Sequence, residues 1–352
     1  MTELPYGAGA GAGAAGAWAM PAETVPHART YLAWPPAGSV WGADTPAVQQ
    51  DIARLARTIA AYEPVTLLAA PAEERRARKA CGAAGPDGSG VEIMPVPVDD
   101  LWVRDSGPVF VTGPGGVAGV DLGFNGWGGK QDHPRDSQVA RRLLECAGRL
   151  RIPAGITAEG GSLEADGEGT LLATESSLVN PNRNPGRSRT DIEQALRQAL
   201  GVRTVIWTEG VRGEDITDCH IDALARFAEP GVVVLGSPAP DAPPVWQRVH
   251  EQARTALEQA TDAAGRRLRL IDLPDASEAG RRGPEFLGSY VNYYVANGAV
   301  IVPRFGDRTA DDRAAGTLRE LYPGREIRQI PVDMIAEGGG GIHCATQQEP
   351  VG

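Results

Sequence analysis

The sequence predicts an α/β fold made of about five copies of one strand–loop–strand–helix unit, and two repeated patterns indicate it. Apolar runs that open with glycine recur as GPVFVTG at 107–113, GTLLAT at 169–174, GVVVLG at 231–236 and GAVIVP at 298–303. The tripeptide EGG occurs at 159–161 and again at 337–339. A spacing of about 55–70 residues between the units favours a radially repeated α/β array that leaves no edge strand open. An ordinary α/β sandwich whose strands share a glycine start is the alternative.

The first helix is expected after residues 44–46 (DTP), because a capping residue is followed by proline at the first helical position. Apolar residues then fall on one helical face, at Val48, Ile52, Leu55 and Ile59. The β-branched run VTLLA at 65–69 predicts a strand directly afterwards.

Four further helices are expected between the apolar runs. They cover about 137–150, a segment from Ser188 that ends at Gly201, about 244–263 after a proline pair, and a segment from Thr309 that ends before Pro323. The helix from Ser188 carries an apolar face, at Ile192, Leu196 and Leu200.

Composition excludes several classes of partner. The chain has 352 residues, with 34 Lys and Arg against 45 Asp and Glu, a net charge of −11. We expect no nucleic-acid and no membrane partner, because both need a basic face, and an acidic surface suits a small cationic ligand. The four cysteines form no CxxC pair, which argues against structural zinc and a disulfide framework and favours a reducing, cytoplasmic location.

Residues 1–17 are expected to form a flexible, low-complexity leader, because GAGAGAGAAGA fills positions 7–17. A GxGxxG match lies inside it, but no strand precedes the match, so we do not interpret it as a dinucleotide site. We expect residues 18–352 to form a single catalytic domain.

Unusual polar residues lie in the loops between the paired apolar runs. They occupy residues 99–108, Glu159 with two glycines, residues 218–222, and His343 with Cys344. In a radially repeated fold these loops would converge on one axis. A cysteine, a histidine and several carboxylates brought together there would support nucleophilic catalysis, with the thiolate as nucleophile and the histidine as proton carrier.

Each of these residues also has a purely structural interpretation. Cys344 could be a buried inert thiol, but its loop, EGGGGIHCATQQEP, has four consecutive glycines and polar flanks that are untypical of a core. His220 and Asp222 share one side of an alternating segment, where a pair satisfied within the core is the alternative. Asp105 precedes a Gly-Pro turn and could form a simple salt bridge or a turn cap.

A metal centre and other hydrolytic classes are less consistent with the sequence. The ligand types needed for zinc or iron occur at Cys219, His220, Asp222 and Cys344, but their spacing matches no familiar site, so we expect no metal. The chain contains no GxSxG and no Walker A sequence.

Five motifs, in order, resemble the agmatine deiminase and bacterial peptidylarginine deiminase family of the pentein superfamily. They are WVRDSGP, EGGSLEADGEGTLLATESSLVNPNRNPGRS, GEDITDCHIDALARF, SYVNYYVANGAVIVPRFGD and GGIHCATQQEP. The resemblance runs from Trp18 to Pro350. It implies a five-fold pseudosymmetric α/β propeller that converts a small cationic guanidino substrate without any cofactor. Agmatine would yield N-carbamoylputrescine and ammonia through a covalent cysteine thiouronium, a reaction of putrescine biosynthesis.

The resemblance also implies roles for individual residues. Cys344 resembles the family nucleophile, His220 the general acid and base, and Glu159 the acidic residue beside that histidine. Asp105 and Asp222 resemble the carboxylates that bind the guanidinium. Substrate contacts are expected from Trp102 and Asp99.

Two positions depart from the family pattern. Cys219 stands where the family usually has glycine before the histidine, and Gly341 where it usually has asparagine three residues before the cysteine. Because Cys219 and Gly341 depart from the family pattern, two other functions stay open. One is a deiminase or amidinotransferase for another guanidino compound, such as peptidylarginine or guanidinobutyrate, and the other is a catalytically silent guanidine-binding protein. The residues also leave open whether the chain forms a homo-oligomer.

Overall fold

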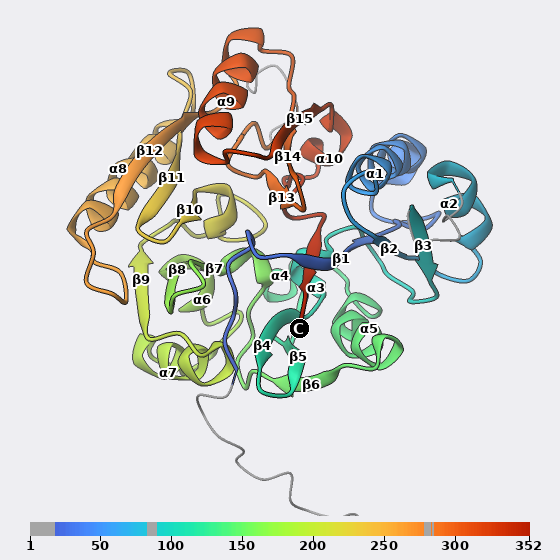
Figure 1. Cartoon of the computed structure of the whole chain (residues 1–352), viewed down its shortest axis with the longest axis horizontal. Coiled ribbons are helices and arrows are strands. Elements are labelled where there is room, and N and C mark those ends of the chain that lie inside the picture. The colour runs from blue at the N-terminus through green and yellow to red at the C-terminus, as the bar shows by residue number, and fades with distance from the viewer. Residues whose placement is uncertain (1–17, 83–89, 278–282, 284) are drawn as a thin grey trace, which may run out of the picture.

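The computed structural model describes residues 18–82, 90–277, 283 and 285–352, so the expected leader at 1–17 lies outside the described residues. Within this part the chain folds into five small mixed sheets with helices between their strands. Figure 1 shows the five sheets set around the centre of the molecule, with the longer helices toward its rim.

Four of the sheets repeat one pattern. The first strand is antiparallel to the second, and the third returns parallel to the second after a helix. The elements are β4 (Val109–Gly113), β5 (Gly116–Asp121), α5 (Val139–Ala147) and β6 (Leu150–Pro153); β7 (Glu164–Ala165), β8 (Thr170–Thr174), α7 (Arg189–Leu200) and β9 (Thr204–Thr208); β10 (Ala225–Glu229), β11 (Val232–Ser237), α8 (Pro244–Gln259) and β12 (Arg269–Pro274); β13 (Tyr294–Ala296), β14 (Ala299–Pro303), α9 (Arg308–Leu321) and β15 (Glu326–Ile330).

The fifth sheet joins the two ends of the described chain. Strand β16 (Gln347–Pro350) pairs antiparallel with β1 (His27–Ala33), with Tyr31 opposite Gln347. Strand β1 is parallel to β2 (Val65–Leu68), which is parallel to β3 (Val91–Met94). Helix α1 (Thr45–Ile59) connects β1 to β2, and α2 (Glu74–Cys81) connects β2 to β3. The last unit is therefore completed only when the C-terminal strand returns to the N-terminal one.

The connections between sheets carry short helical turns. These are the 3-10 turns η1 (Gly42–Asp44), η2 (Asp136–Gln138), η3 (Gly160–Ser162) and η4 (Ile221–Ala223), and the helices α3 (Val103–Ser106), α4 (Gly126–Gly129), α6 (Glu175–Leu178) and α10 (Asp333–Glu337). We expected from the sequence that the loops carrying the unusual polar residues would join the two strands of each pair, and this prediction is wrong. The antiparallel pairs are joined by short turns, and the polar segments instead precede the first strand of each sheet.

The predicted helices are confirmed, with shifted ends. Helix α1 has proline in its first turn and buries its predicted apolar face completely. Helix α7 starts at a capping box between Ser188 and Asp191 and ends at Gly201, which is left-handed at φ 66°. Helix α5 is shorter than expected because Gly148, at φ 63°, ends it before β6 begins.

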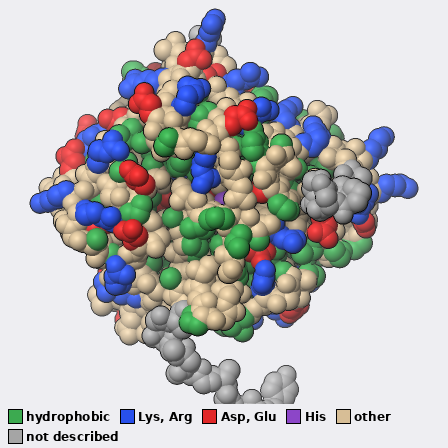
Figure 2. Space-filling view, in the orientation of Figure 1, with side chains coloured by type: hydrophobic (Ala, Val, Ile, Leu, Met, Phe, Trp, Pro, Cys, Tyr) green, Lys and Arg blue, Asp and Glu red, His purple; other side chains and the backbone are tan. Residues whose placement is uncertain are grey.

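Figure 2 shows basic and acidic side chains interspersed over the visible face. Among the described helices, none has both the length and the apolar composition needed to cross a membrane.

Candidate active site

The predicted site residues occupy corresponding places in four of the five units. Asp105 lies in α3 before β4, Glu159 before η3 and β7, and Cys344 before β16. His220 and Asp222 lie at η4, before β10. All five side chains are buried. Because each segment enters the first strand of its sheet, the repeated topology brings residues far apart in sequence to one place.

Gly161 shows how closely these side chains converge. A Cβ atom on this glycine would stand 2.7 Å from His220 Nδ1, 2.8 Å from Asp105 Oδ1 and 3.1 Å from Asp222 Oδ2. The Gly161 N–H donates to Asp105 Oδ1 at 2.9 Å. No larger residue fits here without moving the site, which gives the first EGG motif its physical reason.

His220 lies between two carboxylates. Its Nδ1 is 3.7 Å from Asp105 Oδ2, and its Nε2 is 3.4 Å from Glu159 Oε2. Burial acts to lower the pKa of His220, but Asp105, Glu159 and Asp222 together raise that pKa to about 9. The ring is therefore protonated near neutral pH and can serve as a general acid.

Glu159 forms a buried ion pair with Arg183. Arg183 donates to Glu159 Oε1 at 2.7 Å and to Asp218 Oδ2 at 2.7 Å. Despite complete burial, hydrogen bonding and charge from His220 and Arg183 hold the pKa of Glu159 below its ordinary value. Glu159 is thus an ionised partner for His220.

The thiol of Cys344 sits beside Asp222. Its Sγ lies 3.4 Å from Asp222 Oδ2 and accepts a hydrogen bond from Asn292 Nδ2 at 3.2 Å. Burial, followed by the charges of Asp222 and Asp105, holds the pKa of the Cys344 thiol well above its ordinary value. The thiol is therefore protonated in the ligand-free site, and a cation placed among these carboxylates would favour the thiolate.

Asp105 is oriented by an indole that the sequence gave no reason to select. Trp127 Nε1 donates to Asp105 Oδ2 at 2.9 Å. Burial, together with Asp222 and Glu159, raises the pKa of Asp105 although His220 opposes the shift. A positive ligand would reverse that shift by neutralising the crowded carboxylates.

Unsatisfied polar atoms gather at this site. Nine buried side-chain nitrogen or oxygen atoms in the described residues have no hydrogen-bond partner, and four of them are Glu159 Oε2, Asp222 Oδ1 and both ring nitrogens of His220. Buried polar atoms are nearly always paired, so this concentration indicates that a polar ligand completes the site.

A cavity of about 100 Å³ reaches the nucleophile. Three of the predicted site residues, Trp102, Asp105 and Cys344, line it. His220, Glu159 and Asp222 are not among its lining residues. The remaining lining residues are Val40, Trp41, Asp100, Trp127, Gln131, Ile216, Thr217 and Gly338 to Gly340.

Asp99, where a substrate contact is expected from the sequence, does not line the cavity. The Asp99 carboxylate accepts from the backbone N–H groups of Arg135 and Asp136, and Asp99 is not a lining residue. The neighbouring Asp100 does line the cavity, where it accepts from Trp41 Nε1 at 2.7 Å and from Gln131 Nε2 at 3.0 Å. The loop turns between the two residues, so adjacent carboxylates point to different places.

The side chain of Arg104 is bound by segments distant in sequence and not by its own loop. It donates to Gln348 Oε1 at 2.8 Å and lies 3.4 Å from Glu23. None of the described residues that line the cavity is a lysine or an arginine. The cavity wall therefore offers carboxylates and no cation.

Asn292 occupies the space at the first departure from the family pattern. A Cβ on Gly341 would lie 2.5 Å from Asn292 Oδ1. That oxygen accepts from the backbone N–H of His343 at 3.0 Å and of Cys344 at 3.3 Å. Asn292 thus holds both the backbone and the sulfur of the nucleophile, and Gly341 leaves it room.

Cys219, the second departure, adopts a backbone conformation that favours glycine. Its φ is 69°, and Asp218 before it has φ 60°. The Cys219 N–H donates to Asp215, and Thr174 Oγ1 donates to the Cys219 carbonyl at 2.7 Å. These bonds hold a left-handed turn directly before His220.

Sequence reasoning did not assign roles to Asn292, Trp127, Arg183 and His343, although all four touch the site. One signal could have found Asn292. Each of the other units contributes a polar residue just before its first strand, and Asn292 has that place before β13.

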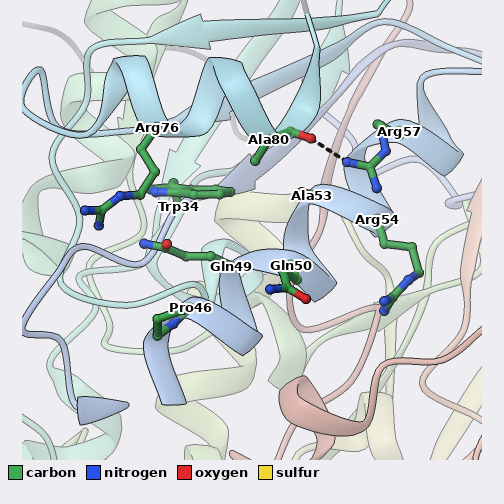
Figure 3. Close-up of a pocket in the computed structure, with 9 residues that line it drawn as sticks. All are labelled: Trp34, Pro46, Gln49, Gln50, Ala53, Arg54, Arg57, Arg76 and Ala80. Atoms are coloured by element: carbon green, nitrogen blue, oxygen red, sulfur yellow. Dashed lines mark hydrogen bonds between the residues drawn. The ribbon is translucent and has the colours of Figure 1, made fainter. Parts of the chain in front are cut away.

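A second cavity, of about 300 Å³, lies between α1 and α2 (Figure 3). None of the predicted site residues lines it. Its arginines already have partners, since Arg54 pairs with Asp51 and Arg76 with Glu73. Within the described residues, no group of three or more His, Cys, Asp or Glu side chains could hold a metal ion.

A buried thiol, a histidine and converging carboxylates in four equivalent connections define a nucleophilic site for a small cation. The family model of Porphyromonas-type peptidyl-arginine deiminase matches residues 19–350, so the chain belongs to this family.

Known proteins resemble the chain over nearly its full length. It is 40% identical to agmatine deiminase of Stutzerimonas stutzeri, covering 94% of this chain and 95% of the relative. It also resembles the solved agmatine deiminase of Enterococcus faecalis, with 29% identity, a TM-score of 0.87 and coverage of 95% of this chain and 96% of that one. DDAH of Pseudomonas aeruginosa shares the fold, with 13% identity, a TM-score of 0.50 and coverage of 92% and 99%.

Proposed function

We propose that the protein is a guanidine deiminase that hydrolyses agmatine to N-carbamoylputrescine and ammonia. The observation that carries this proposal is the convergence of Asp105, Asp222, Glu159 and His220 beside Cys344, with four buried polar atoms unpaired. A guanidinium is planar and carries several N–H donors, so it suits the two unpaired carboxylate oxygens, Glu159 Oε2 and Asp222 Oδ1. The agmatine deiminases that the chain resembles support the same assignment.

The reaction follows from the roles of the site residues. Asp105 and Asp222 bind the guanidinium N–H groups and fix its carbon near Sγ. The added positive charge lowers the pKa of the thiol, which releases its proton to solvent water, and the Cys344 thiolate attacks the carbon. His220 gives its proton to the departing amine, ammonia leaves, and a thiouronium remains. His220 then takes a proton from water, whose oxygen attacks the same carbon and releases the urea product and the thiolate. No metal or organic cofactor enters any step.

The far end of the cavity favours an amine over a carboxylate. Agmatine carries a second cation where arginine has an α-carboxylate as well as an amine. Asp100 lines the cavity, and no described lysine or arginine does. An unpaired carboxylate buried there would cost several kcal/mol, so free arginine fits poorly.

The fold and setting are part of the same proposal. Five corresponding sheets, the last closed by β1 and β16, support a five-fold pseudosymmetric α/β propeller of the pentein type in one domain over residues 18–352. The cysteines of the chain are free thiols, which fits a reducing cytoplasm.

The experiment is an ammonia-release assay on agmatine, arginine, a peptidylarginine and guanidinobutyrate, run in parallel with and without a chelator. The proposal predicts ammonia and N-carbamoylputrescine in equal amounts from agmatine, unchanged by chelation. Transfer of the amidino group to an added amine without ammonia would identify an amidinotransferase, and binding without product a silent protein. Loss of activity on chelation that zinc restores would revive a metal mechanism.

A further inference from the structure

His343 is a buried titratable residue that the proposed reaction does not use. It precedes the nucleophile, and its ring bridges two carboxylates. Nδ1 lies 2.7 Å from Asp222 Oδ2, and Nε2 lies 2.9 Å from Glu23 Oε2.

The two contacts define the protonation of the ring. Ionised carboxylates only accept hydrogen bonds, so a ring that bonds to both must donate from both nitrogens and carry a positive charge. Burial opposes ionisation of both acids. Even so, His343 holds the pKa of Asp222 below its ordinary value, and Arg226 with His343 does the same for Glu23.

The carboxylates near His343 outnumber the arginines that pair with them, so a positive charge on the His343 ring would be stabilised. Glu23, Asp222 and Glu164 face the ring region from three segments. Arg226 is shared between Glu164 at 2.7 Å and Glu23 at 3.0 Å, and Arg104 lies 3.4 Å from Glu23. Neither arginine forms an ion pair with Asp222, whose ion-pair partner is His343, while His220 and Arg226 act on it only through space.

We propose that His343 is a positioning residue whose imidazolium ties Asp222 to Glu23 and fixes the Asp222 carboxylate for the guanidinium. The contact at Oδ2 orients the carboxylate beside Cys344, while Oδ1 keeps no hydrogen-bond partner and stays available to the substrate. This inference rests on the proposed function, because it assigns Asp222 to guanidinium binding.

Two isosteric variants separate the two contacts of the ring. In His343→Asn the amide nitrogen takes roughly the place of Nδ1 and can still donate to Asp222. In His343→Gln the amide nitrogen takes roughly the place of Nε2 and can still donate only to Glu23. Both variants lose the positive charge, so they form a matched pair that differs in the contact to Asp222.

The probes are 2-chloroacetamidine, a planar cation, and 2-chloroacetamide, its neutral analogue, which both alkylate a thiol. For His343→Gln we expect the second-order inactivation rate with chloroacetamidine to fall at least ~30-fold, with less than ~5-fold change for chloroacetamide. His343→Asn should stay within ~5-fold of wild type with the cationic probe. Equal losses with both probes in both variants, or no loss in His343→Gln, would overturn the proposal.

A measurement on the unmodified protein covers the case in which the variants do not fold. Nitrogen NMR of histidine-labelled wild type should find both ring nitrogens of His343 in hydrogen bonds, one to Asp222 and one to Glu23. A ring nitrogen without such a hydrogen bond contradicts the bridge. The alkylation probes do not involve agmatine. Wild-type protein that reacts with chloroacetamidine but releases no ammonia from agmatine would therefore defeat the proposed function separately from the role of His343.

Discussion

The carboxylate of Asp222 lies 3.4 Å from the thiol of Cys344, although 122 residues separate them in the chain. Asp222 stands before the first strand of one unit and Cys344 before the strand that closes another. The pairing of β16 with β1 closes the fifth sheet and also places Cys344 beside the carboxylates. The same strand pairing therefore completes both the fold and the site.

Cys344→Ala should abolish turnover while the protein stays folded, because the thiol is the only proposed nucleophile and its methyl remnant fits the same space. We expect kcat for ammonia release from agmatine to drop more than ~100-fold. Cys81→Ala, a change at a buried thiol in α2, is the matched control and should keep wild-type kcat. A Cys344→Ala protein that keeps more than about a hundredth of wild-type kcat would rule out covalent catalysis through this sulfur.

Stability should fall as pH rises through the titration of His220. The folded-state pKa is raised to about 9 from an ordinary 6.5, so the stabilisation is fully present below pH ~6.5 and is lost between about 6.5 and 9. We expect the free energy of unfolding to drop by about 1–3 kcal/mol over that window. Urea unfolding at several pH values checks it, with His220→Gln as the reference. An equal slope in wild type and variant would contradict the raised pKa.

Cys219→Gly should be tolerated, because the φ of 69° suits glycine. Relief of about 1 kcal/mol of left-handed strain offsets the lost packing and the greater freedom of the unfolded chain, so we expect a net change within ~1 kcal/mol. Cys219→Val should cost more than ~2 kcal/mol, since a β-branched residue is a genuine outlier at this φ. Chemical denaturation compares the two, and equal stability of the valine and glycine variants would show that the turn relaxes.

Much of the site could be predicted from sequence, for identifiable reasons. Cys344, His220 and Asp222 lie in short motifs whose residue types fit their chemistry. The helix that starts at residue 45 has a proline in its first turn, and the one that starts at residue 189 has a capping box. The predicted strand at residues 65–69 is likewise present as β2.

Other residues act only through tertiary contacts that local pattern does not encode. Trp127 reaches Asp105 from α4 by a left-handed backbone at φ 54°, and Arg183 reaches Glu159 from a loop. Whether Asp99 or Asp100 faces the cavity depends on the turn of one loop, which alternation along the sequence does not determine.

Asp100→Asn tests how the far end of the substrate is recognised. Removing this charge should raise KM for agmatine at least ~10-fold with a smaller change in kcat, because the lost interaction involves the remote amine. n-Butylguanidine, which lacks that amine, should be affected much less. Asp99→Asn is the control, since its carboxylate does not line the cavity. Equal effects of the two substitutions on agmatine would show that Asp100 has no special role.

Steady-state kinetics on agmatine and free arginine, in one buffer at one pH, is the most direct test of agmatine as the substrate. Both substrates carry the same guanidinium, so the comparison isolates the negative cavity and its lack of a described lysine or arginine. The account predicts a kcat/KM for agmatine at least ~10²-fold above that for arginine, equivalent to about 2.7 kcal/mol of differential transition-state binding. Comparable values for the two, or a preference for arginine, would contradict it.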